Sequence, residues 1–199
     1  MKLKRILSLA LSGVLAVSML TACGMGSNLS NAVNRSSAAA SDLNGAVTGV
    51  SFRTNDSKLN DAVTAIAGSL TASQAKVNGP VGSGNNIQAT ALQMTGYEDM
   101  DVGRQWDARE DAGEYKFVKI FVFDAENSSY DTLGEATGVI AKAFNGTMKL
   151  QETMATVGDT TNNSYKGYVS AYEVEVGTED APASAWVIGV SLTQTATAK

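Results

Sequence analysis

The stretch KFVKIFVF, residues 116–123, decides the fold class of this chain. Phenylalanines alternate with β-branched residues along it, and successive side chains of a strand point to opposite faces. The phenylalanines are Phe117, Phe121 and Phe123, and the β-branched residues are Val118, Ile120 and Val122. A strand that is apolar on both faces is typically covered on both faces. We therefore expect a central, buried strand here.

Two other segments have the apolar spacing of an α-helix. The first stripe is Leu59, Val63, Ile66 and Leu70, preceded by the N-cap candidates Asn55, Asp56 and Ser57. The second stripe is Leu133, Thr137, Ile140 and Phe144, with Ser128 or Ser129 as N-cap and Asn145-Gly146 as the end. Polar N-caps and a glycine after the last turn are the usual boundaries of helices.

Alternating patterns predict further strands on both sides of these helices. They cover residues 46–52, 87–95, 148–154, 168–176 and 186–192. The order predicts an α+β domain in which two helices pack on one face of an antiparallel sheet. This is the ferredoxin-like βαββαβ arrangement with an added C-terminal hairpin. The alternative omits the strand at 46–52 and gives a cystatin-like helix-on-sheet fold.

The composition excludes several classes of function. The chain has 199 residues, no histidine, one cysteine and a net charge of −5. The usual general base at neutral pH, the Ser-His-Asp triad and histidine zinc ligands are therefore absent. An acidic chain without a basic stripe is not expected to bind nucleic acid.

The N-terminal residues have the layout of a secretory signal: a basic start, an apolar stretch of residues 6–19 and small residues before a cysteine. The apolar stretch is shorter than the roughly 20 residues that span a bilayer. With Leu20-Thr21-Ala22-Cys23 as the lipobox, this segment resembles the signal of bacterial lipoproteins. The resemblance implies cleavage before Cys23 and a diacylglyceryl lipid on that cysteine.

The resemblance also implies a location and a domain organisation. Residues 1–22 would be the signal peptide, and the chain would be anchored on the extracytoplasmic face of a cell membrane. The Ser-, Ala- and Asn-rich residues 23–45 are expected to be a flexible tether, followed by one domain over residues 46–199. The alternative for this segment is a short helix through Leu29 and Val33. The mature chain would have 12 basic and 20 acidic residues, and hence a net charge of −8.

An acidic segment at residues 97–113 contains candidate metal ligands. Asp99, Asp101, Asp107 and Glu110 fall at the first, third, ninth and twelfth places of a calcium-loop pattern. The pattern fails at Gly103 and Arg104, which stand at the fifth and sixth places. The sequence therefore favours a solvated loop whose acids pair with arginines, with a weak calcium site as the alternative.

The same segment contains the candidate partner-binding residues Trp106, Arg104 and Arg109. Trp106 stands in a polar loop between Gln105 and Asp107, and an exposed tryptophan often anchors a partner. The alternative places Trp106 in the core. Tyr168 and Tyr172 lie four residues apart on one predicted strand. This spacing suits a platform for sugars, but their apolar neighbours on the same face favour a core position.

No catalytic constellation emerges from these motifs. We therefore expect a binding or interaction module without a cofactor, whose partner is an envelope protein, a peptide or a glycan. The alternative is a small glycosidase acting on cell-wall glycan, because that chemistry needs two carboxylates and no histidine.

Overall fold

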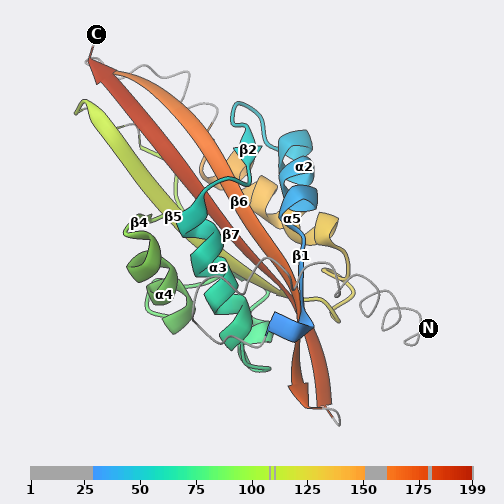
Figure 1. Cartoon of the computed structure of the whole chain (residues 1–199). Helices are drawn as coiled ribbons and strands as arrows, with labels where there is room; N and C mark the ends of the chain where they lie inside the picture. Colours follow the sequence, from blue (N-terminus) through green and yellow to red (C-terminus); the bar gives the residue numbers. More distant parts are fainter. Residues whose placement is uncertain (1–28, 108, 110, 151–160, 179–180, 199) are drawn as a thin grey trace.

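Three long antiparallel strands form the framework of the fold in the computed structural model (Figure 1). The structure describes residues 29–150 apart from 108 and 110, residues 161–178 and residues 181–198. The long strands are β5 (Gly113–Asp124), β6 (Thr161–Thr178) and β7 (Ala181–Ala198). β7 lies between the other two and pairs with β6 over its whole length and with β5 from Ala185 to Ala196.

Four short strands extend this sheet at its two edges. β1 (Ala32–Asn34) runs antiparallel to β6, and β2 (Phe52–Arg53) runs parallel to it. On the other edge, β3 (Gly79–Pro80) runs antiparallel to β5, and β4 (Glu98–Asp99) runs parallel to it. The seven-stranded sheet has the order β1-β6-β7-β5-β3, with β2 on β6 and β4 on β5.

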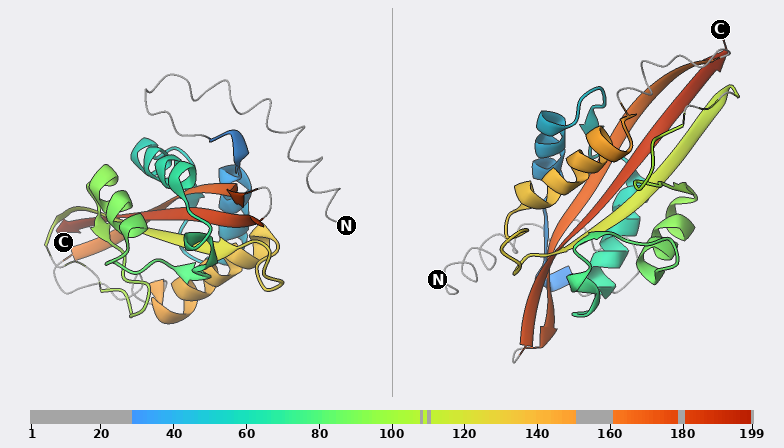
Figure 2. Two further views of the ribbon diagram at one scale, coloured as in Figure 1. Left: turned by 90° about the horizontal axis from the view of Figure 1, so that it is seen from below. Right: turned by 180° about the vertical axis from the view of Figure 1, so that it is seen from behind.

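Helices cover both faces of the sheet. α2 (Ser36–Ala46) and α5 (Leu133–Lys142), which continues as a π-helical turn (Ala143–Thr147), pack on one face. α3 (Ser57–Ser69) and α4 (Asn86–Thr95) pack on the other. Figure 2 shows α3 and α4 on the opposite side of the sheet from α5. Short 3₁₀ turns occur at Leu29–Asn31 and Gln74–Lys76.

Helices α3, α4 and α5 each begin at a residue whose side chain caps the first turn. Asp56 accepts the amide hydrogen of Leu59 at the start of α3, and Asn85 accepts that of Ile87 at the start of α4. Thr132 and Glu135 form a reciprocal capping box at the start of α5. α4 ends at Gly96, whose φ of 69° is left-handed and therefore favours glycine.

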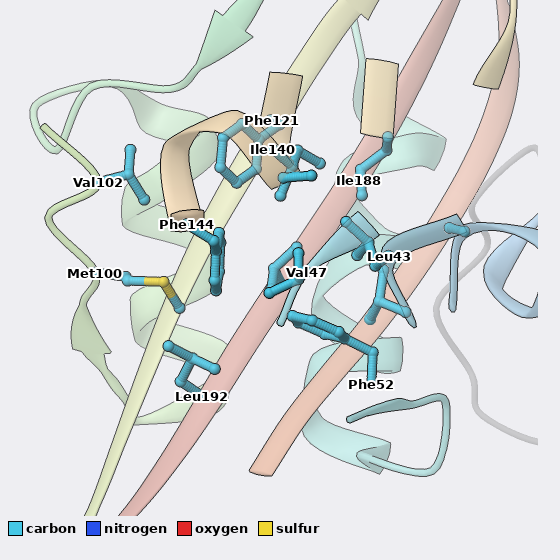
Figure 3. Close-up of a cluster of buried hydrophobic side chains, with 14 of the residues drawn as sticks. Leu43, Val47, Phe52, Met100, Val102, Phe121, Ile140, Phe144, Ile188 and Leu192 are labelled. Carbon is cyan, nitrogen blue, oxygen red and sulfur yellow. The ribbon is translucent and has the colours of Figure 1, made fainter. Parts of the chain in front are cut away.

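The two helix layers enclose two apolar cores that share the sheet. On the α2/α5 face, the phenylalanines of β5 pack with Phe52, Phe144, Ile140 and Leu192 (Figure 3). On the α3/α4 face, Leu59 and Val63 pack on Val118, Ile120 and Val122 of β5. The alternating pattern of residues 116–123 is thus confirmed, since both of its faces are buried.

The α+β class is confirmed, and the predicted stripe of α3 is buried, but the sheet has more strands than predicted. Residues 87–95 were predicted as a strand and form helix α4. Ile87, Ala91 and Thr95 are buried at helical spacing, but only one of them is a large apolar residue. Because helices cover both faces, the described order of elements is neither βαββαβ with helices on one face nor a cystatin-like helix on a sheet.

The expectation of a flexible tether is wrong for the part of residues 23–45 that the structure describes. β1 and α2 belong to the folded domain, which therefore begins before residue 46. Ala39, Ala40 and Leu43 are buried, and Arg35 forms a 2.8 Å ion pair with Glu173 of β6. Small side chains let α2 approach the sheet closely, although the same composition is also typical of a tether.

Two other predicted strands differ from the structure. Of residues 46–52, only Phe52 is in a strand. Met148 and Leu150 are buried, but they lie after the π-helical turn and outside any strand, while residues 151–154 lie outside the described residues. β6 and β7 are buried on both faces along their middle, whereas one wetted face was predicted.

Candidate functional site

A shallow depression of about 360 Å³ lies where β4 and α4 meet the beginning of β5. Its lining is Lys58, the turn of residues 95–98, and residues 114–116 of β5. It combines two tyrosine rings, Tyr97 and Tyr115, with two lysines and two glutamates. This depression is our candidate site, and it adjoins the acidic segment that the sequence singled out.

Tyr97 is held at the centre of this site by hydrogen bonds and by two cations. Its hydroxyl donates to both carboxylate oxygens of Asp56, at 3.2 and 3.1 Å. The Nζ atoms of Lys58 and Lys116 each lie 5.8 Å from the centroid of its ring. Lys58 also donates to the carbonyl of Thr95 at 3.0 Å. The ring therefore has a fixed position between two cations.

Asp56 connects this site to the central strand. Besides capping α3, it accepts a hydrogen bond from the Ser191 hydroxyl of β7 at 3.0 Å. Burial, and then the negative charge of Asp56, raise the pKa of Tyr97 to about 12. The Tyr97 phenol therefore remains a neutral hydrogen-bond donor throughout the physiological pH range.

A second polar network, next to the site, joins α4 and β4 to the edge of β5. The Gln88 side chain of α4 donates to the carbonyl of Val118 at 3.0 Å and accepts the amide hydrogen of Ile120 at 3.0 Å. It also donates to Asp99 at 2.7 Å, and Asp99 pairs with the buried Lys119 at 3.1 Å. These bonds satisfy strand-edge groups that would otherwise be buried without partners.

The three candidate calcium ligands that the structure describes are not gathered around a common point. Asp99 pairs with Lys119, while Asp101 and Asp107 both pair with Arg104, at 3.1 and 2.8 Å. Glu110 lies outside the described residues. Among the residues that the structure describes, no group of three or more acidic side chains could hold a metal ion. Pairing with arginine is the arrangement that the sequence favoured.

Trp106 lies in the core and not on the surface. Its exposed fraction is 7%, and its ring meets Phe117 edge-on at a centroid distance of 4.7 Å. Its amide hydrogen bonds to the carbonyl of Met148 at 2.8 Å. This is the core alternative named above, so we do not expect Trp106 itself to contact a partner.

The two candidate arginines lie at different places in the acidic segment. Arg104 is exposed between its two aspartates. Arg109 pairs with Glu98 at 2.7 Å and lies over the rings of Tyr115 and Phe117, at 4.8 and 5.4 Å. Arg109 therefore stiffens the border of the depression, and a role of either arginine in partner binding stays a prediction.

The proposed tyrosine platform of Tyr168 and Tyr172 is not formed. Tyr172 is buried, and its hydroxyl lies 3.0 Å from that of Thr64 in α3. Tyr168 is half-buried on the same face of the sheet and packs, like Tyr97, against the core under α3 and α4.

Comparisons of the chain with protein-family models, with curated proteins and with solved structures find no match. Within the described part of the chain, no helix is long and apolar enough to cross a membrane. The function is therefore inferred from the residues and their geometry.

Replacement of Trp106 by alanine is expected to lower the free energy of unfolding by about 3–5 kcal/mol, because a buried aromatic residue leaves a cavity. Urea melts followed by circular dichroism measure this loss. The matched control is Arg104→Ala, whose exposed ion pairs contribute about 0–1 kcal/mol. Similar, small losses in the two variants would contradict the core position of Trp106.

The raised pKa of Tyr97 predicts a loss of stability in alkali. The unfolded chain ionises this phenol near pH 10, whereas the folded chain keeps the proton until about pH 12. The folded state binds more protons in this window, so stability falls as pH rises from about 10 to 12. The ionisation of Tyr97 is measured by absorbance at 295 nm, as the difference between the titration curves of the parent and of Tyr97→Phe. The midpoint of this difference curve is the pKa of Tyr97. A midpoint near 10 would contradict the Asp56 contact.

Proposed function

We propose that this chain is a lipid-anchored extracytoplasmic binding module that presents the depression around Tyr97 to a ligand in the cell envelope. The lipobox Leu20-Thr21-Ala22-Cys23 supports the proposed anchoring. The proposed binding is supported by the solvent-open depression, in which rings, cations and hydrogen-bonding groups converge. Cys23 itself lies outside the described residues.

The position of β1 relative to the site supports this reading. Leu29 follows Cys23 by six residue positions, a stretch of chain that can span at most about 21 Å. β1 follows immediately and pairs with β6 near Val174. A lipid on Cys23 would hold this end of the sheet, with the β6–β7 hairpin, near the membrane.

The candidate site lies at the other end of the same strands. Lys166 of β6 is in register with Thr193 of β7 and, through it, with Lys116. Eight residues separate Lys166 from Val174, which corresponds to about 27 Å along a strand. An anchor at the β1 end would therefore direct the depression away from the bilayer, where an envelope ligand can reach it.

The glycosidase alternative receives less support from the described geometry. Glu98 and Glu114 both line the depression, but Glu98 pairs with Arg109 at 2.7 Å and Glu114 with Lys116 at 3.1 Å. Both carboxylates are therefore occupied by ion pairs, whereas a glycosidase directs its two carboxylates at the scissile bond. We therefore propose binding and not hydrolysis.

The anchored orientation can be measured by energy transfer to the membrane. The chain has one cysteine, so a cysteine introduced at Glu175 or at Thr197 is the single free thiol once Cys23 is lipidated. We expect a dye at Glu175→Cys to transfer energy to acceptor-labelled headgroups more efficiently than a dye at Thr197→Cys. Position 175 lies near β1, and position 197 near the site end.

The control for this measurement is Cys23→Ala, which should not associate with the vesicles. Mass spectrometry of the mature N-terminus should show a diacylglyceryl modification on Cys23. An unmodified Cys23, or equal transfer from the two positions, would contradict the proposal.

A further inference from the structure

At the site end, the three long strands run past the helices, as Figure 1 shows. On the α3/α4 face, the register places Lys166, Thr193 and Lys116 in one row across β6, β7 and β5. The row beyond it is Ser164, Thr195 and Glu114. This end of the sheet face therefore presents polar side chains where its middle is apolar.

Cations gather on this face although the chain as a whole is acidic. Lys116 and Lys166 are exposed on the strands, and Lys58 is exposed at the start of α3. Arg53 of β2 is exposed beside Tyr168, its register partner on β6. We call the four basic residues on this face the cationic row: Lys116, Lys166, Lys58 and Arg53.

The carboxylates near the cationic row do not neutralise its positive charge. Asp56 accepts its hydrogen bonds from Tyr97, Ser191 and the Leu59 amide, so its charge is directed into the protein. Glu98 pairs with Arg109, which lies over the ring of Phe117. Glu114 pairs with Lys116, but both side chains are at least 42% exposed, so this pair is weak and exchangeable.

We propose that the ligand of this site is an acidic glycan, a chain of sugar rings that carries carboxylate or phosphate groups, bound along the cationic row with its rings against Tyr168, which lies on the same face beside Arg53. This inference rests on the proposed function and specifies its ligand. The lysines on β5 and β6 stand two strand spacings apart, about 10 Å, which suits an extended ligand with repeated charges.

The surroundings of the row favour a glycan over a peptide. The accessible neighbours of the row include the hydroxyls of Ser164 and Thr195, which both donate and accept hydrogen bonds as sugar hydroxyls do. The depression is shallow and lined by charged and tyrosyl side chains, so it offers no apolar pocket for a peptide anchor residue.

The net negative charge of the chain does not oppose this local attraction at physiological salt. Charges are screened over about 8 Å in 0.15 M salt, so the residues nearest the ligand decide its affinity. Lys58, Lys116 and Lys166 are those residues. Distant acids such as Glu173 lie on the opposite face of β6, where Glu173 pairs with Arg35.

Isothermal titration calorimetry of the full chain in non-ionic detergent, with a galacturonate decamer as the probe, tests the proposal. We expect saturable binding that weakens by about tenfold or more between 50 and 500 mM NaCl, because screening removes ion pairing. Lys116→Glu and Lys166→Glu should each weaken binding by about tenfold, since each reverses a contacting charge.

The matched control is Lys142→Glu, an exposed lysine of α5 on the other helix layer, which should leave the affinity unchanged. Near-ultraviolet circular dichroism verifies that all variants fold. Equal binding of a neutral dextran decamer, or an equal loss in Lys142→Glu, would overturn the proposal.

The other anionic ligands are also distinguished. Equal or tighter binding of a polyglutamate decamer would overturn the glycan in favour of an acidic peptide, and binding of phosphatidylglycerol vesicles alone would overturn it in favour of a lipid surface. Neither result would contradict the proposed anchoring through Cys23, because binding in the detergent titration does not depend on the lipid.

Discussion

The fold depends on β7, the strand that both helix layers and both long neighbouring strands contact. Its side chains alternate between the two cores, with Trp186, Ile188 and Val190 on one side and Ala185 and Val187 on the other. Gly189 brings α3 close: a Cβ atom there would lie 3.1 Å from Leu59 and from Ile120, and closer still to Val63. Every other described element packs on this strand or on one of its partners.

The position of the candidate site follows from the unequal lengths of strands and helices. β6 and β7 have 18 residues each, whereas the longest described helix, α3, has 13. A residue of a strand advances about twice as far as a residue of a helix, so the sheet must extend past its helices. Its uncovered end carries polar side chains, and the Asp56–Tyr97–Ser191 contacts fix that end to the start of α3.

Local patterns predicted those parts of the fold in which large apolar residues repeat. The pattern of residues 117–123 and the stripe of Leu59, Val63 and Ile66 were correct because their apolar residues are large and buried. α2 and α4 were missed because small or polar residues make up most of their buried faces. The pairing of Tyr97 with Asp56 joins residues 41 positions apart, and the cationic row depends on strand register, so sequence spacing could reveal neither. The core position of Trp106 also required the long-range contact with Tyr165.

Substitution of Gly189 tests the central role of β7 most directly. Gly189→Ala should lower the free energy of unfolding in urea by about 1–3 kcal/mol, because an added methyl group overpacks the contact between α3 and the sheet. Gly138→Ala on α5 is the matched control, since a Cβ atom there meets nothing within 4 Å, and it should raise stability by about 0.5–1 kcal/mol through helix propensity. Equal stabilities of Gly189→Ala and the parent would contradict the close packing of α3 on β7.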